Sequence, residues 1–280
     1  MLREVRAASH WRSVDFISDL HLHPEDPDTA QAWQDYLANT PADAVFILGD
    51  LFEVWPGDDC LEAPSDQVAP APGHRAASRA EACAETSSAK TRAFARACAA
   101  ALRVASGRLD LHFLHGNRDF LLGSGFAAAT GAQLLADPVV LDFGPRKVLL
   151  SHGDALCLDD VDYQRFRAQV RDPAWIGALL QRPLAEREAL GRQLRAQSDA
   201  RHAAQPTYAD ADTALACRWL RVAGAQVLVH GHTHRPADHD LGDGLIRQVL
   251  SDWDARAQPP RAQALRLTAE GQFQRVNLLP

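Results

Sequence analysis

The sequence predicts an α/β domain in which polar residues cluster at the ends of buried strands. Three observations predict it. Short apolar runs with the length of buried strands alternate with stretches of helical periodicity. Five of these runs lead into a polar motif, and all but the first motif contain glycine. The length of 280 residues suffices for one domain of this kind with insertions.

The first half of the chain supplies three predicted strands. Residues 14–18 and 44–48 are apolar runs typical of buried core strands. Between them, residues 29–37 show the periodicity of an amphipathic helix. Helical character returns at residues 92–104, and residues 109–114 predict the third strand. The domain is therefore expected to begin with a strand followed by a helix.

The second half supplies two further strands and a group of helices. Residues 147–150 and 226–229 predict strands that each lead into a polar motif. From about residue 160 to residue 220, several helical stretches are separated by prolines. Residues 247–278 contain three short alternating segments that could close a second sheet.

These patterns predict a core and a cap. The core comprises residues 1–157 and 222–280, and the helical cap comprises residues 158–221, inserted between two core strands. Residues 60–90 are rich in alanine, proline and serine, and prolines interrupt helical periodicity there. This segment is predicted to be a low-complexity surface insertion without a functional role.

Composition and missing motifs exclude several classes of protein. The net charge of −7 and the lack of a basic strip with interleaved aromatic residues predict that the protein has no nucleic-acid partner. Five scattered cysteines without a Cys-x-x-Cys pair predict neither a disulfide framework nor a thiolate zinc site, and favour a reducing cytoplasm. No signal-like segment and no uncharged apolar run of about 18 residues is present, so no membrane span is expected. The sequence also lacks a Walker-type loop and a Gly-x-Ser-x-Gly elbow.

The polar motifs at the strand ends carry the chemistry. Any one of them alone is more often a capped or hydrogen-bonded structural residue than a functional one, but five in this order favour a shared function. Spacing of two residues within the first and last motif points two side chains the same way. The motifs are Asp19-Leu20-His21, Gly49-Asp50, Gly116-Asn117-Arg118-Asp119, His152-Gly153-Asp154 and His230-Gly231-His232.

This set of side chains suits two divalent cations. Aspartate, asparagine and histidine without cysteine favour Mn²⁺, Fe²⁺ or Zn²⁺ over an oxygen cage for Ca²⁺. The carboxylate of Asp50 can bridge two ions. Two ions roughly 3.5–4 Å apart can activate a water for in-line attack on phosphorus, so no protein nucleophile is required.

The ordered motifs resemble those of the calcineurin-like metallophosphoesterase superfamily, from residue 14 to about residue 236. The resemblance implies two mixed β-sheets sandwiched between helices, with a helical cap insertion and with the ions at the strand ends. It places the metal ligands at Asp19, His21, Asp50, Asn117, His152, His230 and His232. His115, Asp119 and His234 are then expected to orient these ligands or steady their charge, and a strand-end hydrogen-bonding role alone is the alternative for each.

The motifs are longer than the superfamily requires, as in Leu48-Gly49-Asp50-Leu51-Phe52-Glu53 and His230-Gly231-His232-Thr233-His234-Arg235-Pro236. They resemble the UDP-2,3-diacylglucosamine pyrophosphohydrolases of lipid A synthesis. That resemblance implies hydrolysis of UDP-2,3-diacylglucosamine to UMP and 2,3-diacylglucosamine 1-phosphate (lipid X). It also implies two divalent metal ions as cofactors, with Mn²⁺ as the first choice. It also implies peripheral contact with the cytoplasmic face of the inner membrane and no required protein partner.

The resemblance also assigns residues to catalysis and to substrate. Catalytic roles fall on Asp50, Asn117, Arg118 and His230, and the Arg118 guanidinium is well shaped to clamp a pyrophosphate. The residues implied in substrate binding are Asn117, Arg118, Asp160, Arg195, Ser198 and His230. The match departs from the family where His202 and Gln205 replace the usual Asn and Lys.

Apolar side chains in the cap predict a groove for acyl chains, although helix packing explains them as well. They are Phe166, Val170, Trp175, Ile176, Leu179, Leu180 and Leu184.

Two alternative functions remain open. One is a soluble nucleotide or dinucleoside-polyphosphate hydrolase on the same metal core, which needs no apolar cap. The other is a non-catalytic scaffold, which usually shows a broken ligand set.

Overall fold

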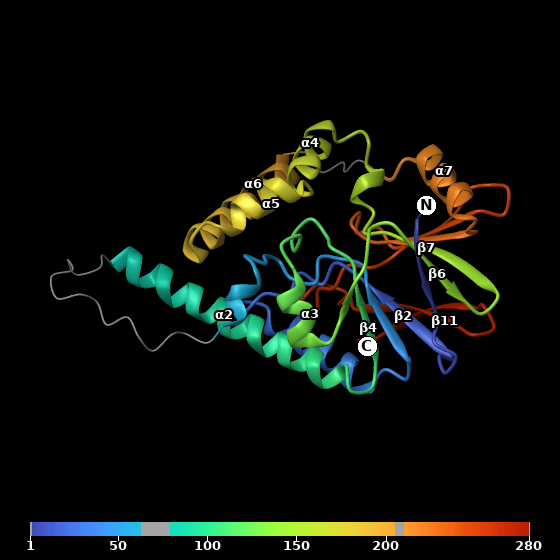
Figure 1. Cartoon of the computed structure of the whole chain (residues 1–280), viewed down its shortest axis with the longest axis horizontal. Helices are drawn as coiled ribbons and strands as arrows, with labels where there is room; N and C mark the ends of the chain where they lie inside the picture. The colour runs from blue at the N-terminus through green and yellow to red at the C-terminus, as the bar shows by residue number, and fades with distance from the viewer. Residues whose placement is uncertain (1, 63–78, 205–209, 280) are drawn as a thin grey trace.

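The computed structural model describes residues 2–62, 79–204 and 210–279, without the side chains of residues 79–85 and 198–204. The described chain forms two six-stranded sheets (Figure 1). The first sheet has the order β12 (Phe273–Asn277), β11 (Gln263–Thr268), β2 (Ser13–Ile17), β3 (Ala44–Ile47), β4 (Asp110–Phe113) and β5 (Gln133–Leu134). The second has the order β1 (Arg3–Arg6), β6 (Val139–Phe143), β7 (Arg146–Leu150), β8 (Val227–His230), β10 (Ile246–Val249) and β9 (Ala237–Asp240).

Both sheets are mixed, as predicted. In the first, β2, β3 and β4 run parallel, whereas β11 pairs antiparallel with β2 and with β12. In the second, β7, β8 and β10 run parallel, and β6 and β9 join them antiparallel. The five strands predicted to precede polar motifs are therefore β2, β3, β4, β7 and β8, three from one sheet and two from the other.

Alternating side chains of the central strands fill two different cores. Phe46 of β3 belongs to the cluster that also holds Leu141 of β6 and Val229 of β8, which lies between the sheets. Its neighbours Val45 and Ile47 belong to the cluster shared with the helices over the first sheet. Successive strand residues point to opposite faces, so burial of both faces explains the continuous apolar runs in the sequence.

Helices cover the outer faces of both sheets. The first sheet packs against α1 (Pro27–Asn39), α2 (Arg79–Ala105) and α3 (Ser124–Thr130), which contribute Trp33, Leu102 and Phe126. The second sheet packs against α7 (Thr213–Ala223) through Ala216 and Leu220. Two short 3-10 helices, η1 (Asp58–Leu61) and η2 (Asp154–Leu156), lie in the loops.

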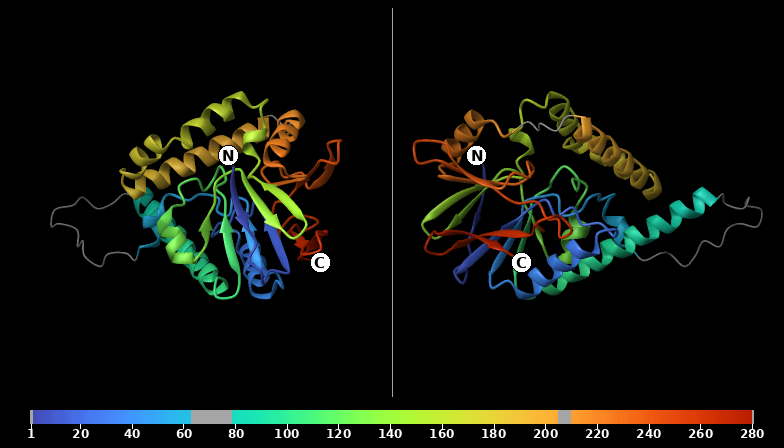
Figure 2. Two further views of the ribbon diagram at one scale, coloured as in Figure 1. Left: turned by 45° about the vertical axis from the view of Figure 1, so that its right-hand side comes forward. Right: turned by 180° about the vertical axis from the view of Figure 1, so that it is seen from behind.

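Three further helices form a separate group at one end of the sandwich. They are α4 (Val161–Val170), α5 (Pro173–Leu180) and α6 (Leu184–Ala204), and all views show them together, away from the sheet faces (Figures 1 and 2). Asp160 and Asp172 cap α4 and α5 by accepting hydrogen bonds from Tyr163 N and Ala174 N. Among the described helices, none has both the length and the apolar character needed to cross a membrane.

The structure departs from the expected elements in three places. First, α7 begins within the range predicted for the cap, but it packs on the second sheet because its apolar stripe faces that sheet. Second, α2 begins at Arg79, inside the predicted insertion and earlier than residue 92, while residues 63–78 lie outside the described chain. Third, the strands of the C-terminal tail are divided between both sheets.

Candidate metal centre

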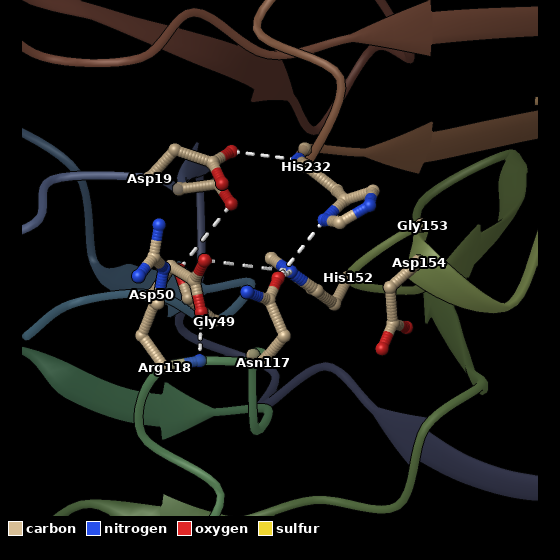
Figure 3. A network of polar contacts seen from close by, with 12 residues as sticks. Asp19, Gly49, Asp50, Asn117, Arg118, His152, Gly153, Asp154 and His232 are labelled. Carbon is tan, nitrogen blue, oxygen red and sulfur yellow. Dashed lines mark hydrogen bonds and ion pairs between the residues drawn. The ribbon is translucent and has the colours of Figure 1, made fainter. Parts of the chain in front are cut away.

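The predicted ligands come together at the strand ends of both sheets. Asp19, Asp50 and Asn117 follow β2, β3 and β4 of the first sheet, and His152 and His232 follow β7 and β8 of the second. Figure 3 shows these five side chains directed toward one another. The residues were predicted from separate motifs, so their meeting point is a property of the fold.

The backbone at this point is held in an unusual conformation. Asp19, His21 and Asp50 have φ values of 56°, 48° and 53°, and His232 and His234 have φ values of 67° and 52°. Residues other than glycine rarely adopt this left-handed region. Such backbone strain is found mainly at functional sites, where the surrounding structure enforces it. The local sequence could not have predicted this strain.

Two overlapping groups of donor atoms could each hold a cation. In the first group, atoms of Asp19, His21 and His234 lie within 4.8 Å of one another. In the second, atoms of Asp19, Asp50 and His152 do so. Asp19 is common to both groups, and Asp50 Oδ2 lies 3.7 Å from His152 Nε2 and 4.0 Å from His21 Nε2. Asp50 therefore also lies between the two groups.

Asn117 and His232 complete this cluster. Asn117 Oδ1 lies 3.0 Å from His152 Nε2 and 2.9 Å from His232 Nδ1. The His232 backbone N–H donates to Asp19 Oδ2 at 2.8 Å (Figure 3). Five of the predicted ligand residues are thus linked by direct contacts across the two sheets.

His230 and His234 are placed differently from their expected roles. Among the described residues, His230 is in neither donor group; its Nδ1 donates to the Gly231 carbonyl at 2.8 Å. His230 Nε2 is buried and has no hydrogen-bond partner, so its lone pair is available to a ligand. His234, expected only to orient ligands, is itself in a donor group, with Nε2 3.4 Å from Asp19 Oδ1 and 3.3 Å from His21 Nε2.

The donor set fits divalent metal ions. Imidazole binds a metal in its neutral form, and burial lowers the pKa of His230 to about 4 and that of His232 to about 3. The pKa of Asp19 is well below its ordinary range, because contact with His234 and nearby histidines outweighs its burial. The neutral imidazoles of His230 and His232 beside the ionised carboxylate of Asp19 are donors that such ions bind. At His152 the charges of nearby aspartates outweigh burial and raise the pKa to about 9, so a bound ion would displace a proton there.

Glycine lets the loops approach closely. A Cβ on Gly116 would lie 2.0 Å from Asp50 Oδ1, and one on Gly231 would lie 2.2 Å from Asp19 Oδ2. Any side chain at either position would collide with a carboxylate of the cluster.

The residues expected to support the ligands do so to different degrees. Asp119 is fully buried and accepts from the backbone N–H groups of Leu51 and Gly116, both at 2.8 Å, so it ties together the loops that carry Asp50 and Asn117. Burial, together with the charge of Asp50, raises the pKa of Asp119 to about 7. His115 instead lies 2.6 Å from the carbonyl of Leu122, which anchors the following turn.

A polar cavity of about 440 Å³ opens beside the cluster. Its walls include His21 and His234 of the first donor group and the predicted substrate residues Arg118 and Arg195. Glu53, to which no role was assigned from the sequence, contacts both arginines. Its position three residues after Asp50 was the only signal available, since nothing local shows which partners it meets.

The other predicted substrate residues lie in the cap. Asp160 is exposed and accepts from Tyr163 N at 3.0 Å. The side chains of Ser198 and His202 are outside those described, and Gln205 is outside the described residues. Of the predicted groove residues, Val170 and Leu179 are buried and Leu180 is exposed. Trp175, Ile176 and Leu184 pack against the core under the first sheet.

Comparisons with known proteins identify the family. The model of the calcineurin-like phosphoesterases matches residues 12–236. A UDP-2,3-diacylglucosamine hydrolase of Chromobacterium violaceum is 41% identical, with 86% of this chain and 90% of that protein covered. Enzymes of the same name from Chromohalobacter salexigens (41% identical, 85% and 87% covered) and Pseudomonas aeruginosa strain PAO1 (38%, 94% and 98%) are also similar. The chain therefore belongs to the calcineurin-like phosphoesterase family, within the group of the UDP-2,3-diacylglucosamine hydrolases.

Proposed function

We propose that this protein hydrolyses the pyrophosphate bond of UDP-2,3-diacylglucosamine, giving UMP and 2,3-diacylglucosamine 1-phosphate (lipid X) for lipid A synthesis. The observation that carries the proposal is similarity over nearly the whole length of hydrolases that bear this substrate in their name. The convergence of Asp19, Asp50 and His152 supports a hydrolytic centre, as do the donor groups around them.

Seven side chains would hold two divalent ions, for which Mn²⁺ is the first choice: Asp19, His21, Asp50, Asn117, His152, His230 and His232. His234 joins this set as a further candidate because it shares a donor group with Asp19. When bound, such ions activate a water for attack on phosphorus and neutralise charge on the phosphoryl oxygens.

The protein's own residues would bind and orient the substrate. Arg118 lies on the cavity wall, and its backbone N–H donates to Asp50 Oδ1 at 2.8 Å, so the arginine that would bind the pyrophosphate directly contacts a residue that would hold metal. Arg195 reaches the same cavity from α6. Asn117, Asp160, Ser198 and His230 complete the proposed substrate set.

The helical cap formed by α4, α5 and α6 would hold the acyl chains. The sugar phosphate would lie at the cluster of proposed metal ligands. We further propose that the protein works peripherally at the cytoplasmic face of the inner membrane, where a substrate with two acyl chains resides. No protein partner is required by this scheme.

Incubation of the purified protein and Mn²⁺ with UDP-2,3-diacylglucosamine tests the proposal. Release of UMP together with lipid X, in equal amounts, is the expected result. A parallel panel of soluble nucleotides and dinucleoside polyphosphates distinguishes the alternative substrates. Turnover of that panel without turnover of the lipid would overturn the proposal, and inactivity toward every substrate with Mn²⁺ bound would favour a scaffold.

A further inference from the structure

Glu53 connects the metal centre, the pyrophosphate clamp and the cap. Its side chain lies in the loop after β3 and is almost wholly buried. Oε2 lies 3.0 Å from His21 Nδ1. Oε1 lies 3.2 Å from an Arg118 guanidinium nitrogen and 3.3 Å from Arg195 Nε. One carboxylate thus meets three partners that belong to the loop after β2, the loop after β4 and helix α6.

The electrostatics keep this carboxylate charged. Burial alone would raise its pKa, but contact with His21 and the charges of His21, Arg118 and Arg195 lower the pKa of Glu53 to about 2. A buried anion is tolerated when it is paired in this way. Glu53 is therefore the shared acidic partner of one imidazole and two guanidinium groups.

The two nitrogens of His21 face different partners. Nδ1 lies 3.0 Å from Glu53 Oε2, whereas Nε2 lies 4.0 Å from Asp50 Oδ2 and 3.3 Å from His234 Nε2. A carboxylate at Nδ1 favours the proton on that nitrogen and leaves the lone pair of Nε2 for a metal ion. The same carboxylate draws two guanidinium groups from separate elements to one wall of the cavity.

We infer that Glu53 is a positioning residue that orients His21 toward the metal ions and holds Arg118 and Arg195 together as a receptor for the substrate's pyrophosphate. The second half of this inference rests on the proposed function. The first half concerns metal binding alone and is independent of the substrate. Charge-assisted contacts to two preorganised arginines suit a dianionic diphosphate.

The substitution Glu53→Gln tests the inference because it keeps the size of the side chain and removes its charge. Calorimetric titration of the metal-free protein with Mn²⁺, without substrate, measures the first half. We expect the affinity to fall by about 10 to 100-fold, as is typical when a partner that orients a metal ligand is lost. At saturating Mn²⁺, KM for UDP-2,3-diacylglucosamine should rise by more than kcat falls.

Glu188→Gln is the matched control, because Glu188 is also a buried glutamate and contacts Ser88 between α6 and α2. It should leave both Mn²⁺ affinity and KM unchanged. If Glu53→Gln does not fold, as judged by circular dichroism, Glu53→Asp replaces it. The shorter carboxylate should lower the Mn²⁺ affinity by less than is expected for Glu53→Gln, and KM should still rise. Wild-type Mn²⁺ affinity in the Glu53 variant would overturn the metal half. A wild-type KM would overturn the receptor half.

If the wild-type protein does not hydrolyse the lipid substrate, the proposed function fails, yet the Mn²⁺ titration still decides the role of Glu53 toward His21. The two failures are therefore distinguishable.

Discussion

Asp154 Oδ2 lies 2.9 Å from Arg167 Nε, and this ion pair, with Asp154 fully buried and Arg167 partly buried, joins the loop of His152 to the first cap helix. The same oxygen accepts a hydrogen bond from Tyr163 Oη at 2.7 Å. Arg171, the residue that follows the end of α4, donates to the carbonyls of His115 and Gly116 at 3.0 and 3.1 Å. The cap is thus fastened to two of the loops that carry predicted metal ligands.

Replacing Asp154 with Asn should destabilise the protein, because the partly buried Arg167 loses its nearer counter-charge and keeps only Asp137, at 3.9 Å. Loss of the hydrogen-bonding partner of such a charged group costs about 1 to 3 kcal/mol. Urea denaturation at neutral pH measures the change. Asp162→Asn is the control, because Asp162 forms an exposed pair with Arg165 on the same helix and should change stability by less than about 1 kcal/mol. Equal unfolding midpoints for the two variants would contradict the prediction.

Asp50→Ala should abolish hydrolysis while the fold persists, because the carboxylate between the two donor groups is lost. We expect a reduction in kcat of at least about 1,000-fold, corresponding to about 4 kcal/mol of transition-state stabilisation. Steady-state assays with saturating Mn²⁺ measure it. Asp35→Ala, on the exposed face of α1, should retain full activity. Near-native turnover in the Asp50 variant would refute the assignment.

Arg118→Ala should weaken handling of the pyrophosphate, because a charged donor on the cavity wall is removed. A fall in kcat/KM of about 100-fold is expected from the loss of one charge-assisted interaction. Arg118→Lys keeps the charge but not the planar fork, so it should recover only part of the loss. Full recovery with lysine would show that charge alone is sufficient.

Stability toward acid should depend on His112. Burial lowers the pKa of His112 to about 4, only partly offset by Asp110, and its ring stacks on Phe46 with centroids 4.4 Å apart. Below the unfolded-state pKa of about 6.5, the unfolded chain binds a proton that the folded protein excludes, so stability falls as the pH drops toward 4.

The full loss from this group is about 3 kcal/mol, and none of it appears above pH 7. His112→Phe should remove this contribution, so the drop in unfolding free energy between pH 7 and pH 4.5 should be smaller in the variant. Denaturant titrations of both proteins at the two pH values measure the difference. An identical drop in the two proteins would rule out the titration of His112 as a cause.

Removal of divalent metal should inactivate the protein and lower its Tm. A metal that binds only the folded state stabilises it by about 2.7 kcal/mol at 100 times its Kd. Thermal melts with chelator, and again after addition of excess Mn²⁺, measure the shift. The Asp50→Ala variant should show a smaller shift, and a Tm insensitive to both treatments would contradict a metal centre.

The sequence by itself determined the local parts of this protein. Apolar runs buried on both faces predicted the central strands, because such burial leaves no polar alternation, and the residue types after each strand predicted a metal centre. The order of the motifs predicted the family, which the family model confirms. These features depend on neighbouring residues only.

Tertiary structure alone decided how these parts meet. The motifs of β2, β3 and β4 face those of β7 and β8 across two sheets, and neither the assignment of α7 to the second sheet nor the donor group of His234 follows from local pattern. The three contacts of Glu53 join residues that are far apart in sequence. Hydrophobic periodicity records that a face is buried but not what covers it, so such contacts are set only when the sheets and helices pack.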